Sequence, residues 1–167
     1  MITINTSKGD ISIKLHDDVA PKTAANFLEY VRDGFYENTV FHRVIKGFMI
    51  QGGGLTASLE NKKTNAPVVN ESHTDNPNKR GTIAMARTAA PDSATAQFFI
   101  NLVDNAFLNK RGDSPDACGY CVFAEVVEGM DIVDAIATVK TGSRMGHDDV
   151  PLEEITINKI TETSEAQ

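Results

Sequence analysis

"FHRVIKGFMIQGGG", residues 41–54, carries both a fold signal and a candidate site. Two apolar segments flank a break at Lys46, which is typical of two neighbouring strands. On the first segment His42 and Arg43 face opposite sides of the sheet, because side chains alternate along a strand. A guanidinium beside so many apolar side chains needs partners for its N–H donors, and Gln51 is a plausible one. Taken alone, Arg43 is equally compatible with a surface salt bridge. For His42, a hydrogen-bonded structural role is favoured over a catalytic one.

The three glycines at positions 52–54 do not form a phosphate-binding loop. A P-loop needs Gly-Lys-Ser/Thr at the start of a helix, a dinucleotide loop needs GxGxxG between a strand and a helix, and neither pattern is present. We interpret the glycines as positions of a tight bend or a close backbone approach. A hydrolytic triad built on Ser93 and His42 is also disfavoured, because no GxSxG elbow surrounds the serine.

Alternating apolar residues on both sides of this stretch predict a mainly β protein. Strand-like patterns occur at residues 2–6, 11–15, 39–45, 47–52, 82–87, 96–103, 121–127 and 155–160. Residues 20–34 and 131–139 have the apolar spacing of amphipathic helices. Eight short strands with only two helices favour a closed eight-stranded antiparallel β-barrel, capped by the helices, over a doubly wound α/β fold. Long irregular stretches at 55–80 and 105–119 are candidate functional loops.

Length and charge limit the class of protein. The 167 residues, 41% of them hydrophobic, suit one globular domain, which we place at residues 1–167. The formal net charge of -7 and the lack of Lys and Arg runs argue against binding to nucleic acid. No stretch of about 18 apolar residues is present, and the first residues do not resemble a secretory signal, so we expect no membrane span and a cytoplasmic protein.

Two cysteines stand as "CGYC" at positions 118 and 121, a spacing used by redox dithiols and zinc sites. The segment after Cys121 reads as a strand, whereas a thioredoxin-like dithiol opens a helix. The four histidines are scattered singly, so a zinc site is not expected. We interpret Cys118 and Cys121 as reduced thiols in or near a strand, and predict neither a metal nor a cofactor.

Further motifs accompany the opening stretch: "GTIAMART" at 81–88, "ATAQFFIN" at 94–101, "NAFLN" at 105–109 and "GYCVFAEVVEGMDIVDAI" at 119–136. Together they resemble the cyclophilin family of peptidyl-prolyl cis-trans isomerases, and the similarity covers essentially the whole chain. The compact bacterial cytoplasmic type, with a single domain, is the most similar. The resemblance implies an eight-stranded barrel with a helix at each end, a peptide site on its outer surface, and isomerisation of X–Pro bonds without a metal or cofactor.

The resemblance also assigns roles to particular residues. It makes Arg43 the catalytic arginine and Gln51 the residue that orients Arg43 and contacts the peptide. The proline pocket is implied to consist of Phe48, Met49, Phe99 and Leu108, and the peptide groove to include Ala86, Arg87 and Gln97. The implied partners are proline-containing peptides and unfolded or folding proteins, and nothing demands more than a monomer. A binding module for proline peptides, with incidental turnover, remains the alternative function.

Three positions depart from the pattern common in the family. Phe107 stands where many members have tryptophan, which removes an indole N–H that cyclosporin uses, so weak cyclosporin binding is expected. Tyr120 stands where histidine is common and is expected to close the pocket with a different polar contact. Arg87 stands where asparagine is common. It adds a cation to the groove, with a preference for acidic flanking residues, or it is a simple surface charge.

Overall fold

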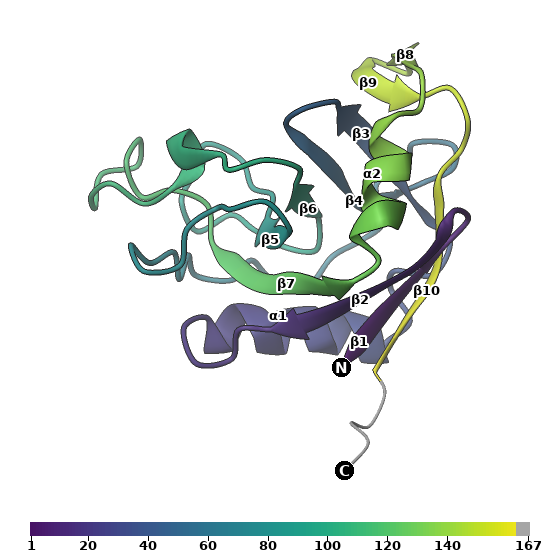
Figure 1. The fold of residues 1–167 in the computed structure, drawn as a ribbon. Coiled ribbons are helices and arrows are strands. Elements are labelled where there is room, and N and C mark those ends of the chain that lie inside the picture. The colour runs from purple at the N-terminus through teal and green to yellow at the C-terminus, as the bar shows by residue number, and fades with distance from the viewer. Residues whose placement is uncertain (163–167) are drawn as a thin grey trace.

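A computed structural model describes residues 1–162 as a closed antiparallel barrel (Figure 1). Its eight strands are hydrogen-bonded in the order β1-β10-β3-β4-β6-β5-β7-β2, and β2 pairs with β1 to close the ring. The barrel strands are β1 Ile2–Thr6, β2 Gly9–Leu15, β3 Thr39–Ile45, β4 Met49–Thr56, β5 Thr82–Met85, β6 Phe98–Asn101, β7 Val122–Glu128 and β10 Thr156–Glu162. The remaining elements are α1 Pro21–Arg32, α2 Met130–Ala137, a 3-10 helix η1 Ala106–Leu108, and a hairpin of β8 Thr141–Arg144 and β9 His147–Pro151. The predicted barrel is therefore confirmed.

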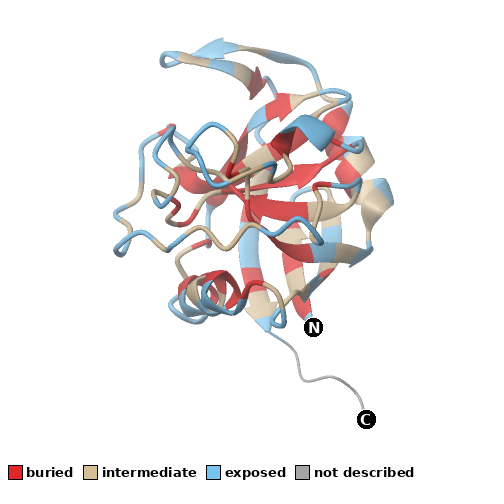
Figure 2. Cartoon of the chain, turned by 90° about the vertical axis from the view of Figure 1, so that its left-hand side faces the viewer, coloured by how far each residue is buried: buried red, intermediate tan, exposed pale blue. Residues whose placement is uncertain are grey.

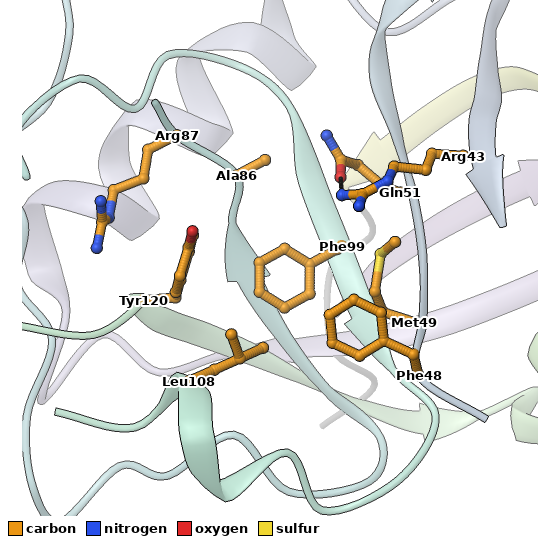
Figure 3. A pocket seen from close by; sticks show the side chains of 9 residues that line it. All are labelled: Arg43, Phe48, Met49, Gln51, Ala86, Arg87, Phe99, Leu108 and Tyr120. Atoms are coloured by element: carbon orange, nitrogen blue, oxygen red, sulfur yellow. Dashed lines mark hydrogen bonds between the residues drawn. The ribbon is translucent and has the colours of Figure 1, made fainter. Parts of the chain in front are cut away.

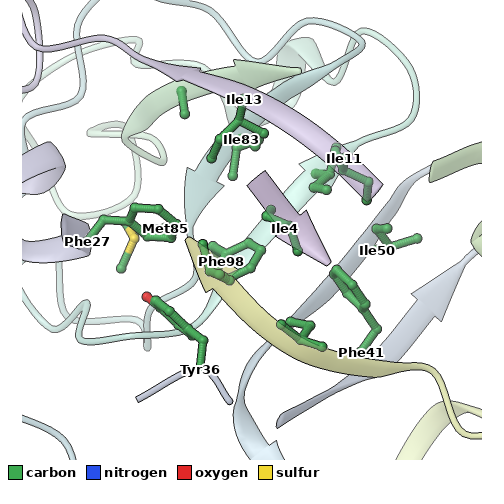
Figure 4. Packing of buried hydrophobic residues seen from close by; sticks show 14 of the residues in the cluster. Ile4, Ile11, Ile13, Phe27, Tyr36, Phe41, Ile50, Ile83, Met85 and Phe98 are labelled. Atoms are coloured by element: carbon green, nitrogen blue, oxygen red, sulfur yellow. The ribbon is translucent and has the colours of Figure 1, made fainter. Parts of the chain in front are cut away.

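Side-chain alternation builds the core inside this barrel. Along β1 every second residue is buried, and Ile4 is 0% exposed. Figure 4 shows Ile4, Ile11, Ile13 and Phe98 meeting in the interior, and Figure 2 shows buried residues concentrated on the barrel strands. The helices close the core, because the Phe27 ring of α1 packs 5.7 Å from the Phe98 ring, and Val133 and Ile136 of α2 join the same apolar cluster.

The glycine run lies inside β4, where the barrel wall is crowded. A Cβ at Gly53, which has a φ of +91°, would lie 2.7 Å from the Phe98 ring and 3.0 Å from the Tyr36 ring. A Cβ at Gly52 would lie 2.7 Å from the Val40 carbonyl oxygen. The predicted close backbone approach is confirmed, whereas β4 continues through the glycines to Thr56 instead of ending at position 52.

The β8–β9 hairpin was not predicted. Its sequence is polar, and its turn includes Met145 at a φ of 51°, so neither alternation nor a common turn pair marks it. The hairpin lies outside the barrel, where Val150 of β9 packs against Val40, Leu55 and Leu59. The hairpin therefore packs on the barrel through Val150, although its local sequence does not predict a hairpin. Among residues 1–162, no helix is long and apolar enough to span a membrane.

Candidate active site

The pairing of β3 with β4 positions the arginine. Arg43 lies opposite Gln51 in the register of the two strands. Its Nη1 donates a hydrogen bond to Gln51 Oε1 at 3.4 Å, and Gln51 Nε2 donates to Gln97 Oε1 at 3.0 Å. The predicted partnership of Arg43 with Gln51 is confirmed, although the Arg43 side chain is exposed rather than buried. The glutamine pair, Gln51 and Gln97, thus holds the cation from one side.

A pocket of about 130 Å³ opens beside Arg43 (Figure 3). In Figure 3 the Phe99 ring lies at its centre, with Arg43 and Gln51 on one side and Leu108 and Tyr120 on the other. Most of the lining residues are apolar or aromatic. The lining residues are Arg43, Phe48, Met49, Gln51, Ala86, Arg87, Phe99, Leu108 and Tyr120. The structure therefore brings together nine of the residues that the sequence singled out.

Alternation along β6 separates this pocket from the barrel core. Phe98 belongs to the main core cluster, whereas its neighbour Phe99 packs with Met49, Leu108 and Val122 in a second apolar cluster. Successive side chains on a strand face opposite sides, so the second cluster lies on the outer surface of the barrel. The barrel core therefore supports the pocket from behind without being part of it.

Comparison with known proteins identifies the family. A model of the family described as cyclophilin type peptidyl-prolyl cis-trans isomerase/CLD matches residues 1–162. The chain is a cyclophilin. It has peptidyl-prolyl cis-trans isomerase activity.

The similarity to relatives extends over nearly the whole chain. Peptidyl-prolyl cis-trans isomerase B of Escherichia coli strain K12 is 58% identical over 161 residues, which cover 96% of this chain and 98% of the relative. Isomerase cyp18 of Streptomyces antibioticus is 55% identical over 156 residues, 93% of this chain and 94% of the relative. A crystal structure of a Cryptosporidium parvum cyclophilin in the presence of the dipeptide Ala-Pro has a TM-score of 0.80 at 27% identity, and covers 98% of this chain and 99% of that chain.

Three buried asparagines hold the pocket edge of this cyclophilin, and the sequence analysis missed them. Asn105 Nδ2 donates to the Phe48 carbonyl oxygen at 3.0 Å and to Asn101 Oδ1 at 2.8 Å. Asn101 Nδ2 donates to Asn78 Oδ1 at 3.1 Å, and Asn78 Nδ2 to the Leu108 carbonyl oxygen at 3.2 Å. This network ties η1, which carries Leu108, to the turn that carries Phe48. Two of the asparagines stand in the quoted motifs, but Asn78 lies in a polar loop with no distinguishing signal.

A second pocket of about 210 Å³ adjoins the first. It is lined by Gln51, Ala86, Arg87, Thr88, Ser93, Thr95 and Gln97, so Gln97 lies here rather than in the apolar pocket. Ser93 Oγ donates to the Ala90 carbonyl oxygen at 2.7 Å and accepts from the Thr88 amide at 3.0 Å. Neither bond joins Ser93 to His42, which agrees with the rejection of a hydrolytic triad.

Phe107 lies outside the nine lining residues. Its side chain is 65% exposed and stacks on the Phe48 ring, with the centroids 5.6 Å apart. Tyr120, in contrast, lines the pocket and meets the Phe99 ring edge-on at 5.8 Å. Of the two aromatic substitutions noted in the sequence, only the one at position 120 therefore shapes the pocket lining directly.

His42 lies beside the β8–β9 hairpin, outside the barrel. The expectation that His42 and Arg43 face opposite sides of the sheet is wrong, because the register of β3 and β4 shifts between Phe41 and Arg43, and both Phe41 and Val44 point into the core. His42 is 6% exposed, and its ring is 6.0 Å from that of His147. Its Nδ1 has no hydrogen-bond partner among residues 1–162, so the prediction of a hydrogen-bonded histidine is wrong for this atom. Burial, with smaller contributions from His147 and Arg43, lowers the pKa of His42 from 6.5 to about 4. The contribution of neutral His42 to the free energy of unfolding is therefore fully present above pH 6.5. It is lost as the pH falls toward 4, because the unfolded chain takes up a proton first.

Both cysteines are free and buried. Cys121 precedes β7, as predicted, and burial raises the pKa of its thiol. In the part of the chain that the structure describes, no group of three or more His, Cys, Asp or Glu side chains could hold a metal ion.

Proposed function

We propose that Arg43 is the catalytic residue of this cyclophilin and that the apolar pocket receives the prolyl ring of the substrate. The observation that carries the proposal is a guanidinium held by Gln51 at the edge of a pocket that Phe48, Met49, Phe99 and Leu108 also line. The similarity to a cyclophilin solved in the presence of Ala-Pro supports proline as the occupant.

The chemistry of the amide bond explains why a single cation is useful here. An X–Pro bond resists rotation because nitrogen donates its lone pair into the carbonyl, which gives a barrier of roughly 18–20 kcal/mol and exchange over about 10–100 s. Rotation breaks this conjugation and leaves the lone pair on a pyramidal nitrogen. An N–H of Arg43 that donates to this nitrogen stabilises only the twisted state, which is differential binding of the transition state.

The arginine alone does not supply the required energy. Acceleration by about five decades requires roughly 7 kcal/mol, and a hydrogen bond involving a charged group contributes about 1.5–3 kcal/mol in proteins. The pocket supplies the remainder in two ways. Phe48, Met49, Phe99 and Leu108 hold the ring and exclude water, which strengthens the contact with Arg43. Ala86 and the second pocket hold the peptide that precedes proline, so that one side of the bond stays fixed while the other rotates.

Substitution of Arg43 tests the proposal. In a protease-coupled isomerisation assay on a short X–Pro peptide, Arg43→Ala should lower kcat/KM by at least about two decades, or roughly 2.7 kcal/mol. Arg43→Lys should recover part of this loss, because it retains a positive donor. The exposed Arg111, which donates to the Asp116 carbonyl oxygen at 2.8 Å, provides the control variant Arg111→Ala. A near wild-type rate for Arg43→Ala would refute the assignment of Arg43 as the catalytic residue.

The same variant distinguishes an enzyme from a binding module. If the groove serves mainly to hold proline segments, Arg43→Ala should still support every cellular role of the protein. If turnover matters, peptide affinity should survive in part while cellular complementation is lost.

We further propose proline-containing, unfolded or folding proteins as the substrates, and one domain that acts as a monomer in the cytoplasm. One barrel contains all the strands of residues 1–162 except β8 and β9, which supports a single domain. Two free cysteines suit a reducing compartment. The expectation of weak cyclosporin binding rests on Phe107, because its side chain has no indole N–H to donate.

A further inference from the structure

We propose that Arg87 is a positioning residue for isomerisation, which fixes Tyr120 against the pocket and thereby sets the affinity for the prolyl ring. This inference rests on the proposed role of the pocket. It replaces both sequence-based interpretations of Arg87, because the residue is half-buried and its guanidinium contacts the pocket edge rather than open solvent.

The first contact is with the Tyr120 ring. The guanidinium carbon of Arg87 lies 4.3 Å from the ring centroid, which is a cation–π contact. Tyr120 in turn meets the Phe99 ring edge-on at 5.8 Å. Figure 3 shows Tyr120 between Arg87 and Phe99, with the guanidinium on the side away from Phe99. Arg87 therefore supports Tyr120 from behind.

The second set of contacts fixes the backbone that carries Tyr120. Arg87 Nη1 donates to the Thr88 carbonyl oxygen at 2.9 Å, and Nη2 donates to the Gly119 carbonyl oxygen at 2.9 Å. Tyr120 N donates to the Leu108 carbonyl oxygen at 2.9 Å. The guanidinium thus connects the segment after β5 to residues 119 and 120, and through them to Leu108. A rigid planar fork can bind both carbonyls at once, whereas an ammonium group has no such fixed geometry.

The electrostatics of Arg87 are unusual for a half-buried cation. No carboxylate pairs with it among residues 1–162, and its partners are carbonyl oxygens, a thiol and an aromatic face. Its Nε is buried without a hydrogen-bond partner, which lowers stability. Arg87 therefore holds the pocket edge in place although its guanidinium does not donate all the hydrogen bonds that it could.

Loss of Arg87 should therefore weaken substrate binding rather than the chemical step. In this proposal Tyr120 contacts the prolyl ring in the ground state and in the twisted state alike. When Tyr120 is held less firmly, both states therefore lose the same binding energy. Uniform loss raises KM and leaves kcat unchanged. A merely structural defect behaves differently, because it reduces the fraction of folded enzyme and lowers the apparent kcat at unchanged KM.

The test measures kcat and KM of Arg87→Ala, Arg87→Lys and the control Arg111→Ala on one X–Pro peptide. We expect Arg87→Ala to raise KM by about tenfold, the size of a partly desolvated cation–π contact, with kcat within about twofold of wild type. Arg87→Lys should fall between wild type and Arg87→Ala, because it retains the cation but not the fork. Arg111→Ala should match wild type.

A double-mutant cycle tests whether Arg87 acts through Tyr120. In a Tyr120→Leu background, Arg87→Ala should raise KM much less than in wild type, because only the backbone contact with Gly119 is left to lose. A full KM increase in that background, an unchanged KM in Arg87→Ala, or a fall in kcat alone would each overturn the inference. Failure of the proposed function is distinguishable, because it would appear as wild-type activity in Arg43→Ala, whatever the behaviour of position 87.

Discussion

A methyl group at Gly54 should disturb the active site without straining the backbone. Gly54 lies in β4, and a Cβ there would be 2.4 Å from Gln97 Cγ and 2.8 Å from Gln97 Nε2. Carbon atoms in contact are normally about 3.5–4.0 Å apart, so the Gln97 side chain must move by about 1 Å or more. Gln97 Oε1 accepts from Gln51 Nε2 at 3.0 Å, and this displacement breaks that bond.

The size of the effect follows from the bond that is lost. A hydrogen bond between neutral groups contributes about 1 kcal/mol, and that energy corresponds to about fivefold in rate. If the glutamine pair orients Arg43, Gly54→Ala should lower kcat/KM by about fivefold in a protease-coupled assay. Gly112→Ala is the matched control, because a Cβ there would meet only the Ala117 Cβ, at an ordinary 3.5 Å.

A second substitution shows whether the effect passes through Gln97. Gln97→Ala removes the same hydrogen bond and makes room for the new methyl group, so Gly54→Ala/Gln97→Ala should have the kcat/KM of Gln97→Ala alone. Urea unfolding of each variant separates lost activity from lost stability. Wild-type kcat/KM in Gly54→Ala, or a further loss in the double variant, would refute the reasoning.

Three further outcomes are expected. As the pH falls from 6.5 to 4, the free energy of unfolding of wild type should decrease by up to about 3 kcal/mol relative to His42→Phe, because His42 gains its proton at a higher pH in the unfolded chain than in the folded one. Urea titrations at several pH values measure this difference, and parallel curves would contradict the buried neutral histidine. Phe107→Trp should strengthen inhibition by cyclosporin about tenfold through one added donor; unchanged inhibition of isomerisation would remove indole loss as the cause of weak binding. Cys118→Ser/Cys121→Ser should retain isomerisation per folded molecule, whereas its loss would favour the redox interpretation of these thiols.

The start of the barrel was predictable because burial along its first strands alternates with a period of two. In β1 and β2 the isoleucines that alternate in the sequence are the ones that point into the core. The strand order was not predictable from such patterns, because β10 inserts between β1 and β3 and pairs residues at opposite ends of the chain. Pairing of this kind depends on packing across the closed barrel rather than on local propensity.

Local pattern alone made the site predictable only where its residues are neighbours across one turn, whereas Phe99, Leu108 and Tyr120 were expected from the family resemblance. Arg43 and Gln51 lie opposite each other because β3 and β4 form a hairpin, which fixes their register. The support from Asn78 and Asn101 was not predictable, since three-dimensional contacts alone join a loop residue to a strand 23 positions later. The pattern also gave no reason to place Phe107 outside the pocket lining, where it stacks on Phe48.

The exposure of Arg43 limits when the cation can act. In the free protein, water competes for its N–H donors and screens its charge, so the interaction with a prolyl nitrogen would be weak. A peptide bound as proposed would change this, because a prolyl ring against Phe99 would cover one side of Arg43 while Gln51 holds another. The substrate therefore completes the dry environment in which one charged hydrogen bond becomes strong. Residues that only hold the peptide, such as Arg87 through Tyr120, consequently contribute to the rate at low substrate concentration as directly as the arginine does.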